Sequence, residues 1–112
     1  MAPAFNLETS MNRTEKITMV FRTDIPNRFI KAWISHNAES KSYRLTVVPV
    51  ERRWNYTDGT VTESIKAYSG YTVFVEDAPR FSRKRLEALA ADLKVLERVV
   101  EMAALLGGTD VV

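Results

Sequence analysis

The spacing of apolar residues changes once along this chain of 112 residues, and that change restricts the possible folds. Between Lys16 and Val75 apolar and polar residues largely alternate, as along strands that bury one face. After Ser82 the apolar residues recur every three or four positions, as on one side of a helix. We therefore predict an α+β fold, an antiparallel sheet of four strands followed by one long C-terminal helix. The count becomes five if the last strand divides at a bend near Ser69-Gly70.

Turn residues divide the alternating part into strands. A turn at 24–27 and a polar run at 36–41 separate the first three. Asp58-Gly59 predicts a two-residue hairpin turn, because both residue types tolerate the positive φ that such a turn needs. That turn would set Trp54 opposite Glu63.

The helix is predicted to run from about Arg83 to Leu106, with Ser82 as its N-cap and Gly107-Gly108 at its end. At about 36 Å it would be longer than strands of about 20 to 27 Å. Its apolar residues form two adjacent stripes, and we expect one to pack on the sheet and the other on a second copy. The sheet stripe is Leu86, Leu89, Leu93, Leu96, Val100 and Ala103. The predicted dimer interface is Val95, Val99, Met102 and Leu106.

Length and composition fit one globular domain, with 46% hydrophobic and 27% charged residues. We expect residues 16–108 to form that domain, residues 1–15 an N-terminal arm, mobile or draped over the body, and residues 109–112 a C-terminal tail. The chain has no cysteine, and no segment reads as a secretory signal or a transmembrane span. The expected location is therefore the cytoplasm, without membrane contact.

Few residues could carry catalysis. Without cysteine, and with His36 as its one histidine, the chain has little to offer nucleophilic catalysis, and we interpret His36 as a solvated loop residue. The helix carboxylates suit the solvent side, and no glycine-rich phosphate loop occurs. We expect no enzyme activity, no metal and no cofactor.

Basic and aromatic residues are more informative. Cations gather at the helix start, where the helix dipole disfavours them unless a phosphate or pairing with Glu76, Asp77 and Glu87 offsets them. On the hairpin, aromatic and basic residues share a face that suits base stacking, although its tryptophan could instead anchor the hairpin to the core. The predicted nucleic-acid-binding residues are Arg52, Arg53, Trp54, Tyr56, Arg80, Arg83, Lys84 and Arg85.

The segment from Arg52 to Gly59 resembles the aromatic strand and acidic-glycine turn of the Whirly and positive cofactor four group of single-stranded-nucleic-acid-binding proteins. The predicted strand and helix order is also similar to that group, over about Lys16 to Leu106. The Lys-Gly-Lys-Ala signature of plant Whirly proteins is absent. The resemblance implies a dimer that grips a single strand across its sheets, with Arg52, Trp54 and Tyr56 as contacts.

Two functional hypotheses follow from the sequence. The first is a dimeric protein that binds single-stranded nucleic acid by neutralising phosphates and stacking aromatic rings on bases. The alternative is a protein-interaction or assembly module, like an accessory phage or mobile-element protein, that uses a helix stripe or a strand edge.

Overall fold

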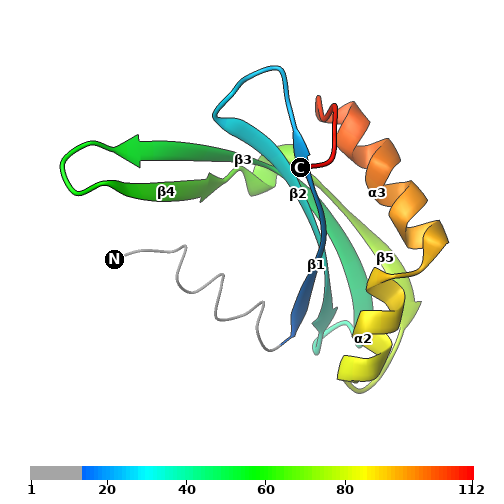
Figure 1. The fold of residues 1–112 in the computed structure, drawn as a ribbon. Coiled ribbons are helices and arrows are strands. Elements are labelled where there is room, and N and C mark those ends of the chain that lie inside the picture. The colour runs from blue at the N-terminus through cyan, green and yellow to red at the C-terminus, as the bar shows by residue number, and fades with distance from the viewer. Residues whose placement is uncertain (1–13) are drawn as a thin grey trace.

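The computed structural model describes residues 14–112, and this part of the chain forms a five-stranded antiparallel sheet with two helices on one face (Figure 1). The predicted α+β class is therefore confirmed. The strands are β1 (Glu15–Arg22), β2 (Arg28–Asn37), β3 (Ser42–Asn55), β4 (Thr60–Ile65) and β5 (Tyr71–Asp77). A short 3-10 turn, η1 (Ala67–Ser69), separates β4 from β5. The helices are α2 (Arg83–Ala90) and α3 (Leu93–Leu105).

Strand β3 organises the sheet, because it pairs with neighbours on both sides. β2 runs along one side of it, while β5 pairs with its first half and β4 with its second half on the other side. β4 and β5 are thus two parts of one returning strand, interrupted at η1 and Gly70. A Cβ atom at Gly70 would lie 2.5 Å from the carbonyl oxygen of Val47, so the strands approach too closely there for a side chain.

The hairpin loop between β3 and β4 is longer than the sequence predicted. Residues 56–59 form it, and Gly59 has a φ of 71° while Asp58 does not take a positive φ. The carboxylate of Asp58 instead accepts hydrogen bonds from the N–H (3.0 Å) and the hydroxyl (2.7 Å) of Thr60. A four-residue loop capped by Asp58 replaces the predicted two-residue turn.

The longer loop shifts the pairing of the two strands by two residues. Trp54 lies opposite Val61 and Arg52 lies opposite Glu63, whereas the sequence set Trp54 opposite Glu63. Because side chains alternate with a period of two, an even shift leaves each one on its predicted face of the sheet.

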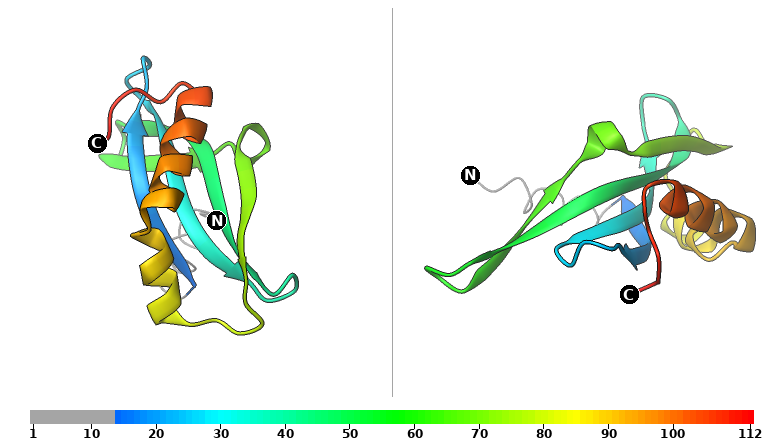
Figure 2. Two further views of the ribbon diagram at one scale, coloured as in Figure 1. Left: turned by 90° about the vertical axis from the view of Figure 1, so that its right-hand side faces the viewer. Right: turned by 90° about the horizontal axis from the view of Figure 1, so that it is seen from above.

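Helices α2 and α3 cover one face of the sheet, and the β3–β4 hairpin extends beyond their cover (Figure 2). The core under the helices contains Phe21, Ile30, Ala32, Ile34, Tyr43, Leu45, Val47, Leu86, Leu89, Val95, Val99, Met102 and Ala103. A second cluster of Trp33, Val48 and Val50, with Ile65 packed against it, lies on the opposite face.

The C-terminal segment forms two helices, so the prediction of one continuous helix was wrong. The helical conformation stops at Ala91, and Asp92 adopts an extended conformation with φ −69° and ψ 128°. Its carboxylate accepts a hydrogen bond from the N–H of Lys94 at 2.8 Å, which caps α3. Each helix is therefore short, about 12 Å for α2 and about 20 Å for α3.

Leu86, Leu89 and Ala103 of the predicted sheet stripe lie in the core, but the break changes which other residues of α3 meet the sheet. Val95, Val99 and Met102 are buried against the sheet, and Leu106 packs on the same core, so these residues do not form an exposed dimer interface. Leu93 and Val100 were assigned to the sheet but are 75% and 48% exposed. In a continuous helix Leu93 would follow Leu89 on one face, whereas two intervening non-helical residues reset the phase.

Residues 109–112, predicted to be a tail, run beside β1. The N–H of Arg22 donates to Asp110 at 2.7 Å, and the N–H groups of Thr109 and Val112 donate to the carbonyls of Arg22 and Val20, each at 2.8 Å. They cover the second half of the β1 edge. Of the predicted arm, residues 1–13 lie outside the described residues.

Candidate nucleic-acid interface

The β3–β4 hairpin presents two strongly exposed aromatic rings of the predicted site. Trp54 is 55% exposed and Tyr56, in the loop, is 90% exposed. Val61, opposite Trp54 on the same face, is 55% exposed. The hairpin projects past the helices (Figure 1). Because more than half of Trp54 is exposed, this residue does not anchor the hairpin to the core. The rings are free to meet a ligand from solvent.

Arg52 shares this face with Trp54 but is held by neighbouring side chains. Its Nε donates to Glu63 at 2.9 Å, and its guanidinium lies 4.3 Å from the centre of the Phe29 ring. Lys31 also forms an ion pair with Glu63. Burial by itself raises the pKa of Glu63, but the hydrogen bonds from Lys31 and Arg52 outweigh it and hold that pKa below its ordinary value. Glu63 thus offsets part of the positive charge on this face.

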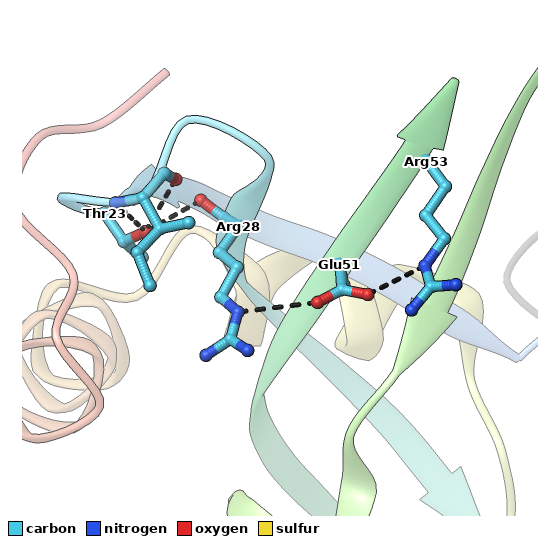
Figure 3. Close-up of polar contacts among 5 residues, drawn as sticks. Thr23, Arg28, Glu51 and Arg53 are labelled. Carbon is cyan, nitrogen blue, oxygen red and sulfur yellow. Dashed lines mark hydrogen bonds and ion pairs between the residues drawn. The ribbon is translucent and has the colours of Figure 1, made fainter. Parts of the chain in front are cut away.

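Arg53 projects from the opposite face of the hairpin, since successive strand residues alternate. Its Nε donates to Glu51 at 3.0 Å, and Nε of Arg28 lies 3.6 Å from the other carboxylate oxygen (Figure 3). The hydrogen bond from Arg53, with the charges of Arg53, Lys66 and Arg28, holds the pKa of Glu51 below its ordinary value. The structure therefore separates Arg53 from Arg52 and Trp54.

A cleft lies on this second side of the hairpin, and we call it the α3-end cleft. Its walls come from the β1–β2 turn, the middle of β3, the segment around η1 and the end of α3. In the turn, the Thr23 hydroxyl lies 3.0 Å from the carbonyl oxygen of Arg28, which fixes the start of β2 beside Glu51 (Figure 3). No sequence motif indicated this cleft, because its walls come from four separate segments.

At the helix start the predicted cap is present. The Ser82 hydroxyl accepts from the N–H of Arg85 at 3.2 Å, and the buried Tyr43 hydroxyl bonds both the N–H (2.9 Å) and the carbonyl (3.1 Å) of Ser82. The Arg85 guanidinium forms two hydrogen bonds with Glu76, at 2.8 and 2.5 Å. This pair lowers the pKa of Glu76 and raises that of Arg85. A local acid therefore offsets at least this cation.

The other predicted cations of the helix start, Arg80, Arg83 and Lys84, are exposed. They lie at the opposite end of the molecule from the hairpin tip, as both views of the fold show (Figures 1 and 2). The two halves of the predicted site are therefore not brought together, and they form separate surfaces.

His36 is not the solvated loop residue that the sequence suggested. It belongs to β2, is half-buried, and packs edge-on against the Tyr43 ring with 5.0 Å between centroids. Its Nε2 lies 2.7 Å from the carbonyl oxygen of Ala78, so it links β2 to the segment before α2. Within residues 14–112 no group of three or more acidic or histidine side chains could hold a metal ion.

Comparisons with protein-family models, with curated proteins and with solved structures found no match. Within the described residues, neither helix has the length and apolar character needed to cross a membrane. The functional proposals therefore depend on the geometry of this chain alone.

Proposed function

We propose that the chain binds single-stranded nucleic acid through the projecting end of the β3–β4 hairpin, which carries Trp54 and Tyr56. The exposure of both rings on a projecting hairpin is the observation that supports it. Stacking of a base on an aromatic side chain contributes about 1 to 3 kcal/mol and needs no particular base. The rings would therefore supply most of the affinity, without strong sequence preference.

Phosphate contacts would contribute less to this affinity. Arg52, Arg53 and Arg85 each pair with a carboxylate of the same chain. Each neutralised phosphate of a single strand adds about 0.7 to the slope of log affinity against log salt. We expect a slope of about −1 to −2, which corresponds to about two phosphates.

Fluorescence anisotropy with a labelled oligothymidine at two salt concentrations tests this proposal. Trp54→Ala and Tyr56→Ala should each weaken binding about tenfold, the equivalent of one lost stack. Tyr68→Ala is the matched control, because Tyr68 is fully exposed but lies in η1, at the base of the hairpin and away from its tip. Absence of binding at low salt, or the same loss in Tyr68→Ala, would contradict the proposal.

Glu63→Gln provides a test in the opposite direction. Without the carboxylate, Arg52 and Lys31 lose their shared partner and become available to phosphate. Binding should tighten and the salt slope should steepen by about one phosphate contact. Circular dichroism would establish that the variant folds. An unchanged affinity in the folded variant would show that this face does not contact phosphates.

We further propose that the chain acts as a dimer, through the side of α3 that faces away from the sheet. Leu93, Leu96 and Val100 line a shallow groove there of about 450 Å³, together with Glu97 and Glu101. Two copies of one stripe can pack around a two-fold axis, because such an interface uses the same surface on each subunit.

The charged residues of α3 divide between two surfaces. Glu97 and Glu101 border the stripe, whereas Lys94 and Arg98 line a shallow cleft with Val73, Phe74 and Val75 of β5. The apolar residues of the stripe would therefore supply the contact between the two copies.

Size-exclusion chromatography with light scattering tests the dimer. Val100→Glu should shift the equilibrium to monomer, because it places a charge within the apolar stripe. Lys94→Glu reverses a charge outside the stripe and should leave the dimer intact. A wild-type monomer at high micromolar concentration, or an unchanged dimer in Val100→Glu, would contradict this interface.

A second candidate function is binding of a protein partner along β5, and the open edge of that strand favours it. Among the described strands β5 pairs with β3 alone, and Tyr71–Asp77 contains no lysine or proline to protect the edge. Phe74 is 55% exposed. A partner could extend the sheet by adding a strand here.

Thr72→Lys distinguishes this candidate, because it places a charge on the exposed edge strand without changing the hairpin. In a nuclease-treated lysate of the source cells, a protein partner should bind the wild type and Trp54→Ala but not Thr72→Lys. Loss of that partner in Trp54→Ala instead would assign the contact to the hairpin.

A further inference from the structure

The α3-end cleft has a volume of about 540 Å³. Ligand pockets in proteins commonly measure about 300 to 1,000 Å³ and combine apolar walls with a few convergent polar groups. This cleft has both kinds of residue, and its walls come from parts of the chain far apart in sequence.

The apolar wall of the cleft includes large apolar side chains that are exposed to solvent. Ile25 is 45% exposed and Leu105 is 72% exposed, and both line the cleft together with Pro49 and Leu106. Large apolar side chains that gather around a concave surface are a feature of binding sites. The wall is suited to a short hydrocarbon chain.

Two cations on the polar side have capacity for a ligand. Nε of Arg28 is 3.6 Å from Glu51, beyond hydrogen-bond distance, and the Arg28 side chain is 52% exposed. The positive charge of Lys66 helps to lower the pKa of Glu51. The Lys66 side chain makes no hydrogen bond or ion pair with the described residues. Glu51 receives its hydrogen bond from Arg53 instead.

The acidic groups nearby do not cancel this charge. Asp24 and Glu51 face three cations, namely Arg28, Lys66 and the Arg53 that bonds Glu51. The end of α3 adds little negative charge, because N–H groups at 107 and 108 already donate to the last helical carbonyls, at 3.1 and 2.7 Å. The cleft therefore has a net positive polar side.

We propose that the α3-end cleft binds a small anionic amphiphile, a carboxylate attached to a short apolar chain. The carboxylate lies between Arg28 and Lys66, and the apolar chain runs along Ile25 and Leu105. This site is separate from the proposed nucleic-acid surface, because Glu51 and Arg53 project from the opposite side of the hairpin to Trp54.

Isothermal titration calorimetry with decanoate, kept below its micelle concentration, tests the site. Decanoate should bind, whereas decyltrimethylammonium, with the same chain and the opposite charge, should bind at least tenfold more weakly. Sedimentation with phosphatidylglycerol vesicles separates a monomeric ligand from a lipid surface. Binding to vesicles without binding to decanoate would overturn the proposal.

Matched variants locate the binding. Arg28→Gln and Lys66→Gln should each weaken decanoate binding about tenfold, and Leu105→Ser should weaken it as well. Lys16→Gln removes an exposed cation of β1, and Trp54→Ala removes the indole on the other face, so both should leave it unchanged. If Arg28→Gln and Lys66→Gln both bound decanoate as tightly as the wild type, or if the wild type bound no decanoate, this site would be excluded. If the protein bound decanoate but no oligonucleotide, the nucleic-acid proposal would fail and the cleft proposal would stand.

Discussion

At the scale of single residues, Tyr43 connects the two layers of the fold. Its side chain is fully buried, and its hydroxyl satisfies both backbone groups of Ser82 immediately before α2. The Ser82 side chain in turn caps that helix. One phenol in the sheet therefore positions the start of the helix layer.

Tyr43→Phe should lower the free energy of unfolding by about 1 to 3 kcal/mol, because it leaves the backbone groups of Ser82 without their partner. Urea denaturation measures this change. Tyr68→Phe removes a hydroxyl from a fully exposed ring and should have no effect. Equal stability of Tyr43→Phe and the wild type would contradict the structural role of the hydroxyl.

Acid should weaken the network around Glu63. Its pKa is lower in the folded chain than in the unfolded chain, so its pairs with Lys31 and Arg52 stabilise the fold fully above about pH 4.5. That stabilisation is lost as the pH falls through the lower folded value. Below about pH 4.5 the free energy of unfolding should fall more steeply in the wild type than in Glu63→Gln. Urea denaturation from neutral to acidic pH would show parallel profiles if the network contributed nothing.

The side chains of the hairpin could be assigned to faces from the sequence, but not to partners. Alternation with a period of two put Arg52 and Trp54 together, and the structure agrees. The ion pair of Arg52 with Glu63 depends on the exact register, which the capping of Thr60 by Asp58 shifted by two residues. The sequence pattern therefore places Arg52 beside Trp54 but does not identify the acid that offsets its charge.

At the scale of elements, the division of the C-terminal segment into α2 and α3 is the main departure from prediction. The apolar spacing continues through Leu93, so the pattern alone indicates one helix. What it does not show is that Asp92 can cap a new helix. A cap in the middle of a periodic segment changes which stripe meets the sheet.

Asp92→Ala should lower stability by about 0.5 to 2 kcal/mol, the usual cost of losing an N-cap. Alanine favours a continuous helix, but that helix would turn Val95 away from the core and Leu93 toward it. Thermal unfolding followed by circular dichroism measures the change. Glu97→Ala, an exposed substitution within α3, is the control and should stay within about 0.5 kcal/mol of the wild type. A more stable Asp92→Ala protein would show that the break is not required.

At the scale of the whole molecule, β3 is the shared element of two sheet halves. Its first half pairs under the helices with β5, and its second half leads with β4 into the exposed hairpin. The separation of the hairpin from the helix start could not be predicted from the apolar pattern, because it depends on how the strands are arranged in space. The residues of the predicted site consequently lie on two separate surfaces.

Amide hydrogen exchange should follow this division. Amides in the middle of β3, such as those of Leu45 and Val47, lie between two neighbouring strands and under the helices, so they should exchange slowest. Amides of the hairpin end, including those of Asn55 and Thr60, should exchange much faster. Nuclear magnetic resonance measures the exchange rates of both sets of amides. Equal protection of the two sets would contradict the expectation that the hairpin end is less stable than the rest of the sheet.

The two tryptophans lie in opposite surroundings, and this has a practical consequence. Trp33 is 8% exposed in the second cluster, whereas Trp54 is 55% exposed on the hairpin. Acrylamide should quench the emission of Trp54 and spare that of Trp33. A ligand on the hairpin would shield Trp54 and leave Trp33 unchanged, while unfolding would open both to the quencher. The intrinsic fluorescence of the unlabelled protein can therefore distinguish occupancy of the hairpin from loss of the fold.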